Sequence, residues 1–550
     1  MESNDFDAIH SYIVDKIDNS KLNDLDPDIL IKVFLTKLLK LKTLPPLFVD
    51  TVHRLGNWYI QSANFSEAKK LYEVLAPRTT FNQEIYGSLA VCYIENGDFE
   101  NALKIYGQME TFAELNLPNA LNKALCLEKL GDHEPAIEIY KFIEQEYPND
   151  LTVLNRLALC YKKVHLDKDA QKVFKKVLKI DEKNIQALNN LGLSEMEYGY
   201  FDQARHFFER ALEYEPLSIS PLYNLSALLA NDQQAHSLLQ KVADLPLSYI
   251  NKDENGYKVS FIKARCFEQL KDYKRAFDFF VSANTMKFSQ FGYDINHDRR
   301  VLQKMAQFIS SPSVKDADVQ PLSSIPIFIV GLPRSGTTLL ERLLSKHRDI
   351  QPLGELSWIA DVIGSIGFPK KLTNDFLVSF RMQFKKVILN YNVERSHYID
   401  KMPLNFRFIP IIQKALPEAK IIILTRDRAP LVWSNYKQNF TSEGCLFTYD
   451  MKCLLNFHSL FVNFISLFDE DSQTLKLSYN QLIGEKDYVM EGLFEFLKLK
   501  QPQIDNGNLQ RDNVPIRTAS LVQVRSEIMT DRDDQWRSYK PYLEDYLKAL

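Results

Sequence analysis

A 34-residue repeat in the first half of the chain is the feature that most constrains its fold. Three kinds of position recur at that spacing: a usually small residue between two helical patterns, an alanine five residues later, and an aromatic residue four residues after the alanine. The three registers are Ala63, Gly97, Gly131, His165 and Gly199; Ala68, Ala102, Ala136, Ala170 and Ala204; and Tyr72, Tyr106, Tyr140, Phe174 and Phe208. Small residues let paired helices approach and aromatic residues fill the space between pairs, so the pattern predicts a stack of helix pairs.

This pattern resembles the tetratricopeptide repeat (TPR), a helix–turn–helix unit of the same length. We place five repeats at about 49–82, 83–116, 117–150, 151–184 and 185–218, a shortened unit at 219–256 and a last unit at 257–290. The array thus covers 49–290, after an N-terminal helical segment of residues 1–48. The resemblance implies an α-helical solenoid whose concave groove receives a protein or peptide, with Asn122, Asn155 and Asn189 as candidates for that face.

Composition limits the other functional classes. A chain of 550 residues is too long for one core, and a net charge of −4 gives no general reason to expect nucleic-acid binding. The six cysteines are scattered, which favours reduced thiols in a reducing compartment, and no cluster has metal-ligand spacing. The N-terminal stretch MESNDFDAIH lacks the features of a signal peptide, and no apolar run approaches the roughly 20 residues that span a bilayer. We therefore expect no metal, no membrane partner and a cytoplasmic location.

The second half of the chain, residues 322–550, follows a helix and polar linker at 291–321 and opens on a strand, a loop and a helix. Ile327 to Val330 form a short apolar run typical of a buried parallel strand, and leucines at helical spacing follow the loop Gly331–Thr338. Such a junction points backbone N–H groups and the positive end of a helix dipole at one place, which suits a phosphate or sulfate group.

The loop departs from the P-loop of nucleotide triphosphatases. Gly331-x4-Gly336 matches the start of G-x-x-x-x-G-K-[ST], but Thr337 occupies the lysine position and the cation of the loop is Arg334. The string Pro333-Arg334-Ser335-Gly336-Thr337-Thr338 resembles the 5′-phosphosulfate loop of sulfotransferases, which bind 3′-phosphoadenosine 5′-phosphosulfate (PAPS). That resemblance implies that the donor contacts Arg334, Ser335, Gly336, Thr337 and Thr338, although an ordinary tight turn is the alternative for the loop alone.

Two further elements resemble those of tyrosylprotein sulfotransferases and of bacterial sulfotransferases fused to TPRs. A glutamate follows Gly354, and the resemblance implies that this residue, Glu355, is the general base. The string Asp400-Lys401-Met402-Pro403-Leu404-Asn405 matches D-K-x-P-x-N, and Lys401 is expected to stabilise the phosphate oxygen that gains charge as the leaving group. The alternatives are a solvated surface glutamate and a salt-bridged surface lysine.

The rest of the donor site is expected beyond a second buried strand. In sulfotransferases an arginine and a serine eight residues apart hold the 3′-phosphate, and Arg426 and Ser434 match them. Ser520 is a weaker donor-site candidate in a segment that resembles the tail that folds over the nucleotide. Two positions depart from the family: Asn480 stands where an acid is usual, and Gln535 where a basic residue usually precedes the tryptophan.

The sequence therefore predicts an α-helical TPR solenoid followed by an α/β P-loop-like sulfotransferase domain with a parallel sheet. We expect transfer of a sulfuryl group from PAPS to a hydroxyl, on a protein or peptide with tyrosine among the acceptors, and release of adenosine 3′,5′-bisphosphate. The alternatives are a TPR scaffold with an inactive nucleotide-binding domain and a P-loop kinase, which Thr337 disfavours. The sequence does not identify the acceptor, the oligomeric state, the source or the effect of Asn480 and Gln535.

Overall fold

The structure is a computed structural model of the chain, and it describes residues 44–243, 245, 253–315, 320–356, 358–389, 391–440, 442–500 and 530–548. The chain divides into two compact units, Met1–Ala187 and Leu188–Leu550. The division falls within the predicted TPR array rather than at its end. The predicted domain bounds themselves stay a prediction.

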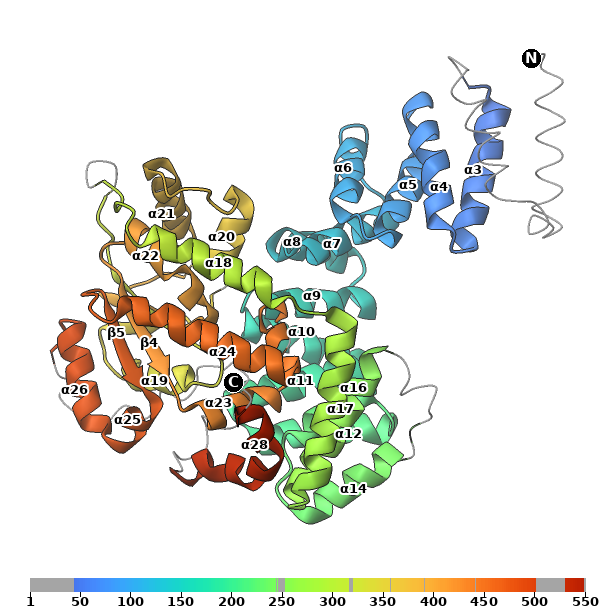
Figure 1. The fold of residues 1–550 in the computed structure, drawn as a ribbon. Helices are drawn as coiled ribbons and strands as arrows, with labels where there is room; N and C mark the ends of the chain where they lie inside the picture. The colour runs from blue at the N-terminus through green and yellow to red at the C-terminus, as the bar shows by residue number, and fades with distance from the viewer. Residues whose placement is uncertain are drawn as a thin grey trace. The chain divides into compact units, whose positions relative to one another are not determined.

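Helix pairs make up the described part of the first unit (Figure 1). The helices are α3 (Pro46–Gln61), α4 (Phe65–Leu75), α5 (Gln83–Glu95), α6 (Phe99–Glu110), α7 (Leu117–Leu130), α8 (His133–Glu146), α9 (Leu151–Lys163) and α10 (Asp167–Ile180). Short polar side chains start several of them; the Asn82 side chain, for example, accepts hydrogen bonds from two backbone N–H groups of α5. The helical solenoid predicted from the repeat is thus confirmed.

The two most regular registers have separate structural causes. The aromatic register is buried, and a Cβ atom added to Gly56 would lie 2.6 Å from the Tyr72 ring, so the first helix needs a small residue opposite that ring. The register between the helices has a left-handed backbone at every copy, with φ of 58° at Ala63, 76° at Gly97 and 65° at His165. Its preference for glycine therefore comes from the turn and not from helix packing.

The second unit begins with further helices and continues into a parallel sheet. Its helices before the sheet are α11 (Ile185–Tyr198), which starts at the end of the first unit, α12 (Phe201–Tyr214), α13 (Ile219–Ser226), α14 (Asp232–Ala243), α16 (Asp253–Gln269), α17 (Tyr273–Phe291) and α18 (Ile295–Phe308). The strands are β1 (Ile325–Gly331), β2 (Ile350–Pro352), β3 (His397–Asp400), β4 (Lys420–Thr425) and β5 (Thr474–Ser478).

The five strands pair in the order β2-β3-β1-β4-β5, and all four pairings are parallel. In the central strand, Phe328 pairs with Asp400 of β3 and Gly331 with Leu424 of β4. The carboxyl ends of β1, β3 and β4 therefore lie at one edge, where parallel α/β sheets bind ligands. This sheet confirms the predicted fold class.

Helices cover both faces of the sheet (Figure 1). They are α19 (Thr337–Leu344), α20 (Trp358–Ile366), α21 (Asn374–Leu389), α22 (Ile409–Ala415), α23 (Arg428–Tyr436), α24 (Met451–Ile465), α25 (Tyr479–Gly484), α26 (Lys486–Phe496) and α28 (Lys540–Lys548), with 3-10 helices η4 (Pro403–Phe408), η5 (Glu443–Tyr449), η6 (Ser466–Phe468) and η8 (Thr530–Tyr539). Alternate residues of β1 point to opposite faces: Phe328 and Val330 pack in the core with α22 and α24, and Ile327 and Ile329 in the core with α19 and α26.

One apolar segment is long enough to cross a membrane by length and composition. It is Met451–Phe468, with a mean hydropathy of 1.3, and 44% of it is buried. Phe457, Phe461 and Phe464 of this segment surround Phe406 in the core of the second unit, which accounts for the apolar composition.

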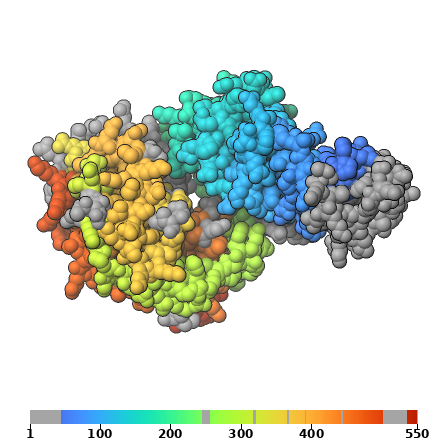
Figure 2. Space-filling view, turned by 90° about the horizontal axis from the view of Figure 1, so that it is seen from above, coloured from blue at the N-terminus to red at the C-terminus, as the bar shows by residue number. Residues whose placement is uncertain are grey.

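The last helix pair before the sheet, α16 and α17, packs directly on the α/β core. Phe277 of α17 stacks on Trp433 of α23 with the ring centroids 5.8 Å apart, and Asn284 Nδ2 donates to the Tyr436 carbonyl at 2.7 Å. Glu268 of α16 accepts from Lys437 Nζ and from the Tyr539 hydroxyl, both at 3.0 Å. In Figure 2 the yellow-green surface of α17 and α18 is continuous with the amber surface of the α/β part of the same unit.

Candidate active site

The loop between β1 and α19 is held by very close packing. Gly336 has a φ of 101°, and a Cβ atom at this position would collide with the Tyr479 ring. A Cβ atom at Gly331 would lie 2.5 Å from the Leu424 carbonyl oxygen of β4. Arg334 has a left-handed backbone with a φ of 69°, a conformation that costs a non-glycine residue about 1–3 kcal/mol. The surroundings therefore impose this loop conformation on the sequence.

Arg334 and Arg426 meet beneath this loop. Arg334 is 8% exposed, and its Nε donates a hydrogen bond of 3.0 Å to Ser434 Oγ. Arg426 Nη1 donates to the Arg334 carbonyl at 2.8 Å, and the Arg426 guanidinium lies over the Tyr479 ring, 4.6 Å from its centroid. Burial, together with the charge of Arg426, lowers the pKa of Arg334 to about 10. An anion bound here would offset both the desolvation and the repulsion between the two cations.

The same region offers hydroxyl and amide groups. Ser335 is fully buried, and within the described residues its Oγ has no hydrogen-bond partner. Thr337 and Thr338 begin α19 and are buried, so the first turn of that helix faces the loop. Asn435, next to Ser434, donates from Nδ2 to the Pro333 carbonyl at 2.8 Å and thereby ties α23 to the loop. Sequence reasoning quoted Asn435 in a motif but gave it no role.

A second cluster surrounds Lys401 at the end of β3. Lys401 is fully buried, and its Nζ lies 2.5 Å from Glu355 Oε1 and 3.8 Å from Glu341 Oε2. Glu341 Oε1 also accepts a hydrogen bond of 3.2 Å from the Gly354 backbone N–H, while Lys401 N–H donates to the Gly354 carbonyl at 2.8 Å. The structure thus brings the predicted base and the predicted lysine together, and it buries the lysine.

Glu341 and Asp400 are two buried carboxyl groups that sequence reasoning missed. Burial raises the pKa of Glu341, and burial raises the pKa of Asp400 to about 7. Trp358 Nε1 donates to Asp400 Oδ2 at 2.8 Å. Asp400 adjoins Lys401 in the recognised motif, which was an available signal. Glu341 lies in a run of leucines on α19, and only the fold shows that it reaches Lys401.

The remaining predicted positions lie elsewhere. Ser520 lies outside the described residues. Asn480 Nδ2 donates to Asp427 Oδ2 at 2.8 Å, so the amide at this unusual position pairs with the residue after Arg426. Gln535 is exposed. Within the described ranges there is no group of three or more His, Cys, Asp or Glu residues that could hold a metal ion.

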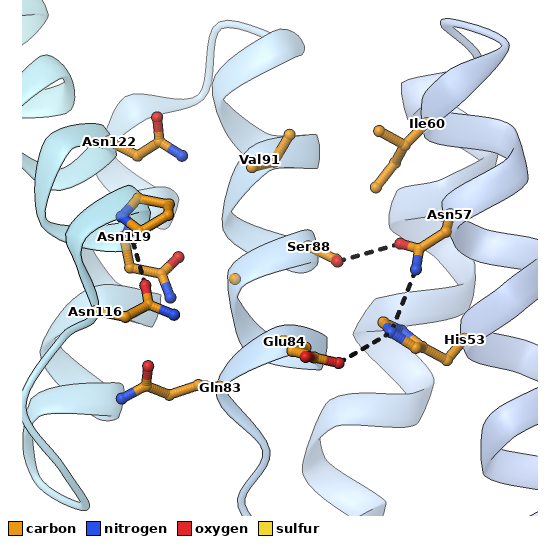
Figure 3. A pocket seen from close by; sticks show the side chains of 12 residues that line it. His53, Asn57, Ile60, Gln83, Glu84, Ser88, Val91, Asn116, Asn119 and Asn122 are labelled. Atoms are coloured by element: carbon orange, nitrogen blue, oxygen red, sulfur yellow. Dashed lines mark hydrogen bonds and ion pairs between the residues drawn. The ribbon is translucent and has the colours of Figure 1, made fainter.

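A polar cavity of about 360 Å³ lies between the first helices of three successive repeats, α3, α5 and α7 (Figure 3). Its lining includes His53, Asn57, Glu84, Asn119 and Asn122. Asn122 is one of the three residues predicted to face the groove. The other two have intramolecular partners: Asn155 Nδ2 donates to the Leu151 carbonyl at 2.9 Å, and Asn189 Oδ1 accepts from Asn224 at 2.8 Å.

Comparison with known families agrees with both halves of the chain. The sulfotransferase family model matches residues 326–503. The tetratricopeptide repeat model matches residues 83–108, and a model of the N-terminal TPR region of psidin matches residues 109–207. The predicted combination of TPRs with a sulfotransferase domain is therefore confirmed.

Several curated proteins are similar to parts of the chain. An uncharacterized protein of Aquifex aeolicus is 29% identical over 313 residues, which cover 53% of this chain and 41% of that protein. A putative protein-tyrosine sulfotransferase of Caenorhabditis briggsae is 22% identical over 41% of this chain and 84% of its own length. Protein-tyrosine sulfotransferase 1 of Danio rerio is 26% identical over 36% of this chain and 58% of its own length.

Solved structures with a similar arrangement are helical repeat proteins. A tetratricopeptide repeat protein from Parabacteroides merdae covers 45% of this chain and 94% of its own, with a TM-score of 0.36 and 16% identity. MamA from Desulfovibrio magneticus covers 31% of this chain and 96% of its own, with a TM-score of 0.30 and 15% identity.

Proposed function

From a chain that joins tetratricopeptide repeats to a domain of the sulfotransferase family, we propose that the protein transfers a sulfuryl group from PAPS to a hydroxyl of a protein or peptide. The observation that carries this proposal is the buried Arg334 in the loop after β1, bonded to Ser434 of α23 and adjacent to Arg426. Two buried or half-buried arginines and a serine at the end of parallel strands suit a donor with two separate phosphate groups.

The donor would lie across the carboxyl ends of β1 and β4. Arg334, Ser335, Gly336, Thr337 and Thr338 would hold the 5′-phosphosulfate, through cation, hydroxyl and backbone N–H contacts at the start of α19. Arg426 and Ser434 would hold the 3′-phosphate, which distinguishes PAPS from ATP. These assignments rest on the family resemblance, and the contacts between Arg334, Ser434 and Arg426 support them.

The transfer needs a base, an electrophilic sulfur and a stabilised leaving group. The acceptor oxygen forms a bond to sulfur while the bond between sulfur and the 5′-phosphate oxygen breaks, and the acceptor proton passes to Glu355. Lys401 donates to the phosphate oxygen, which gains negative charge, and adenosine 3′,5′-bisphosphate leaves. The ion pair of 2.5 Å between Lys401 and Glu355 places both groups at one point of the sheet edge.

Proteins with accessible tyrosines are the proposed acceptors. The similar proteins from Caenorhabditis briggsae and Danio rerio are named as protein-tyrosine sulfotransferases, and the TPR array offers a polar cavity on the face formed by its first helices (Figure 3). We also propose a cytoplasmic location, since all six cysteines are free thiols.

Two measurements test this function. Adenosine 3′,5′-bisphosphate at a hundred times its dissociation constant should add about 2.7 kcal/mol to the stability of the unit that binds it, whereas ADP and ATP–Mg²⁺ should add much less. Incubation with labelled PAPS and a tyrosine-containing protein substrate should then label the protein. A thermal shift with ATP–Mg²⁺ alone would support the kinase alternative, and no shift with any nucleotide would support the scaffold alternative.

A further inference from the structure

We propose that Glu341 is a positioning residue for the sulfuryl transfer: its carboxylate holds the Lys401 ammonium and the backbone of the turn that carries Glu355 in fixed positions relative to the phosphate loop. This inference rests on the proposed function, because Lys401 and Glu355 have their roles only in that reaction. It concerns a residue to which neither the motifs nor the family resemblance gives a role.

The first support is that one carboxylate contacts both catalytic elements. Glu341 Oε2 lies 3.8 Å from Lys401 Nζ, and Glu341 Oε1 accepts the Gly354 N–H at 3.2 Å. The Gly354 carbonyl in turn accepts the Lys401 N–H at 2.8 Å. Glu341, the turn at Gly354 and Lys401 therefore form a closed set of contacts, and removal of the carboxylate opens it at two points.

The second support is that the helix that carries Glu341 also begins at the donor loop. α19 starts at Thr337, directly after Gly336, and it is anchored by Leu340, Leu343 and Leu344 in the core beneath the sheet. Four helical residues separate Thr337 from Glu341, which is about one turn. The position of Arg334 and the position of Lys401 are therefore linked through one rigid segment, since both depend on where α19 lies.

The third support is electrostatic. Lys401 is fully buried and faces Glu355 and Glu341, and Glu341 is itself only 13% exposed. Asp400, adjacent to Lys401, is a further buried carboxyl group that the charge of Glu341 influences. When Glu355 takes a proton from the acceptor it no longer balances the lysine, and Glu341 is the carboxylate that remains beside the buried ammonium. A buried charge that lost every partner would be strongly destabilised.

Glu341→Gln tests the charge, and Glu341→Asp tests the reach. Glutamine keeps an oxygen for the Gly354 N–H but presents no negative charge to Lys401, so kcat should fall about 10- to 100-fold while the KM for PAPS changes less than threefold. Aspartate keeps the charge on a shorter side chain and should recover part of kcat. Glu491→Gln, an exposed glutamate on α26, is the matched control and should leave kcat unchanged.

The pH dependence separates positioning from general damage to the fold. Loss of the negative charge of Glu341 makes the neighbouring base easier to ionise, since a like charge is removed. The acid limb of the kcat/KM profile of Glu341→Gln should therefore move to lower pH, with Glu355, Lys401 and Asp400 as the other titratable groups at the site. A variant that was merely less stable would lose activity without this displacement.

The outcomes are distinct. Lower kcat, a displaced acid limb and partial recovery with aspartate support the role of Glu341. Wild-type kcat and an unmoved profile in Glu341→Gln would overturn that role and leave the sulfotransferase activity standing. A wild-type protein that binds no adenosine 3′,5′-bisphosphate and transfers no label would overturn the proposed function, and this inference with it.

Discussion

Arg334 Nε and Ser434 Oγ lie 3.0 Å apart, which joins the loop after β1 to the helix after β4. The two residues stand far apart in the sequence, and each follows a strand of the same sheet edge. A serine that contacts the loop arginine can sense whether the 5′ end of the donor is in place. The contact therefore makes the two phosphate subsites one structure rather than two independent pockets.

Arg334→Ala should lower kcat by a factor of roughly 100–1,000, because removal of one preorganised cation typically raises the barrier by about 3–4 kcal/mol. Turnover of labelled PAPS by the purified variant measures this effect. Arg334→Gly is a useful companion, because it removes the same cation and relieves the left-handed backbone at a φ of 69°. If the glycine variant folded normally and kept nearly full turnover, the assignment of Arg334 to the donor would be wrong.

Ser434→Ala should weaken adenosine 3′,5′-bisphosphate far more than ADP. A hydrogen bond to a charged group contributes about 1.5–3 kcal/mol, so the dissociation constant for the bisphosphate should rise about 10- to 150-fold. The dissociation constant for ADP, which has no 3′-phosphate, should stay within about threefold of the wild-type value. Isothermal titration calorimetry with both nucleotides provides the comparison, and equal losses for the two would argue that Ser434 supports the loop rather than the 3′-phosphate.

The sequence predicted the strand, loop and helix and the order of the motifs, because these are local patterns. Ile327 to Val330 are fully buried in the central strand, and Thr337 begins a helix directly after the loop. The sequence did not predict that Glu341 would reach Lys401, or that Asn435 would bind the loop backbone. Those contacts depend on how α19 and α23 pack, and side-chain partners across elements have no periodic signal.

Gly336→Ala should destabilise the protein by more than about 1 kcal/mol and abolish bisphosphate binding. The φ of 101° is unfavourable for alanine, and the added methyl group would collide with the Tyr479 ring. Gly364→Ala is the matched control, because this exposed helical glycine has no atom within 4 Å of an added Cβ. That substitution should be stabilising by roughly 0.5–1 kcal/mol. Thermal unfolding of both variants, with and without the bisphosphate, tests the pair; equal effects would contradict the close packing of the loop.

Asp400→Asn should stabilise the protein at pH 8 and have little effect near pH 4. Burial raises the pKa of Asp400 from 3.8 to about 7, so the folded protein keeps a proton on this group over a range where the unfolded chain has lost it. Stability from this group is therefore present at low pH and is lost as the pH rises toward about 7. Asparagine never ionises, and its amide oxygen can still accept from Trp358 Nε1. Urea unfolding at pH 4, 6 and 8 measures the difference, and a stability gain of equal size at all three values would contradict the raised pKa.

Phe277→Ala tests whether the last helix pair before the sheet belongs to the α/β core. Phe277 is 8% exposed and stacks on Trp433 and on Tyr542, with centroid distances of 5.8 and 5.4 Å. Truncation of a buried phenylalanine typically costs about 3–5 kcal/mol. Because Trp433 immediately precedes Ser434 on α23, the variant should also bind adenosine 3′,5′-bisphosphate more weakly than its remaining folded fraction explains.

Phe142→Ala provides the contrast, since Phe142 of α8 is 65% exposed and its loss should change stability by less than about 0.5 kcal/mol. Chemical unfolding gives the stabilities of the two variants, and titration of each below its unfolding transition gives their affinities. If Phe277→Ala were as stable as Phe142→Ala, then α17 would pack on the α/β core without supporting it. A large loss of stability with unchanged affinity would instead mean that α17 holds the core together while α23 keeps Ser434 in place by its own contacts, foremost the hydrogen bond from Asn435 to the Pro333 carbonyl.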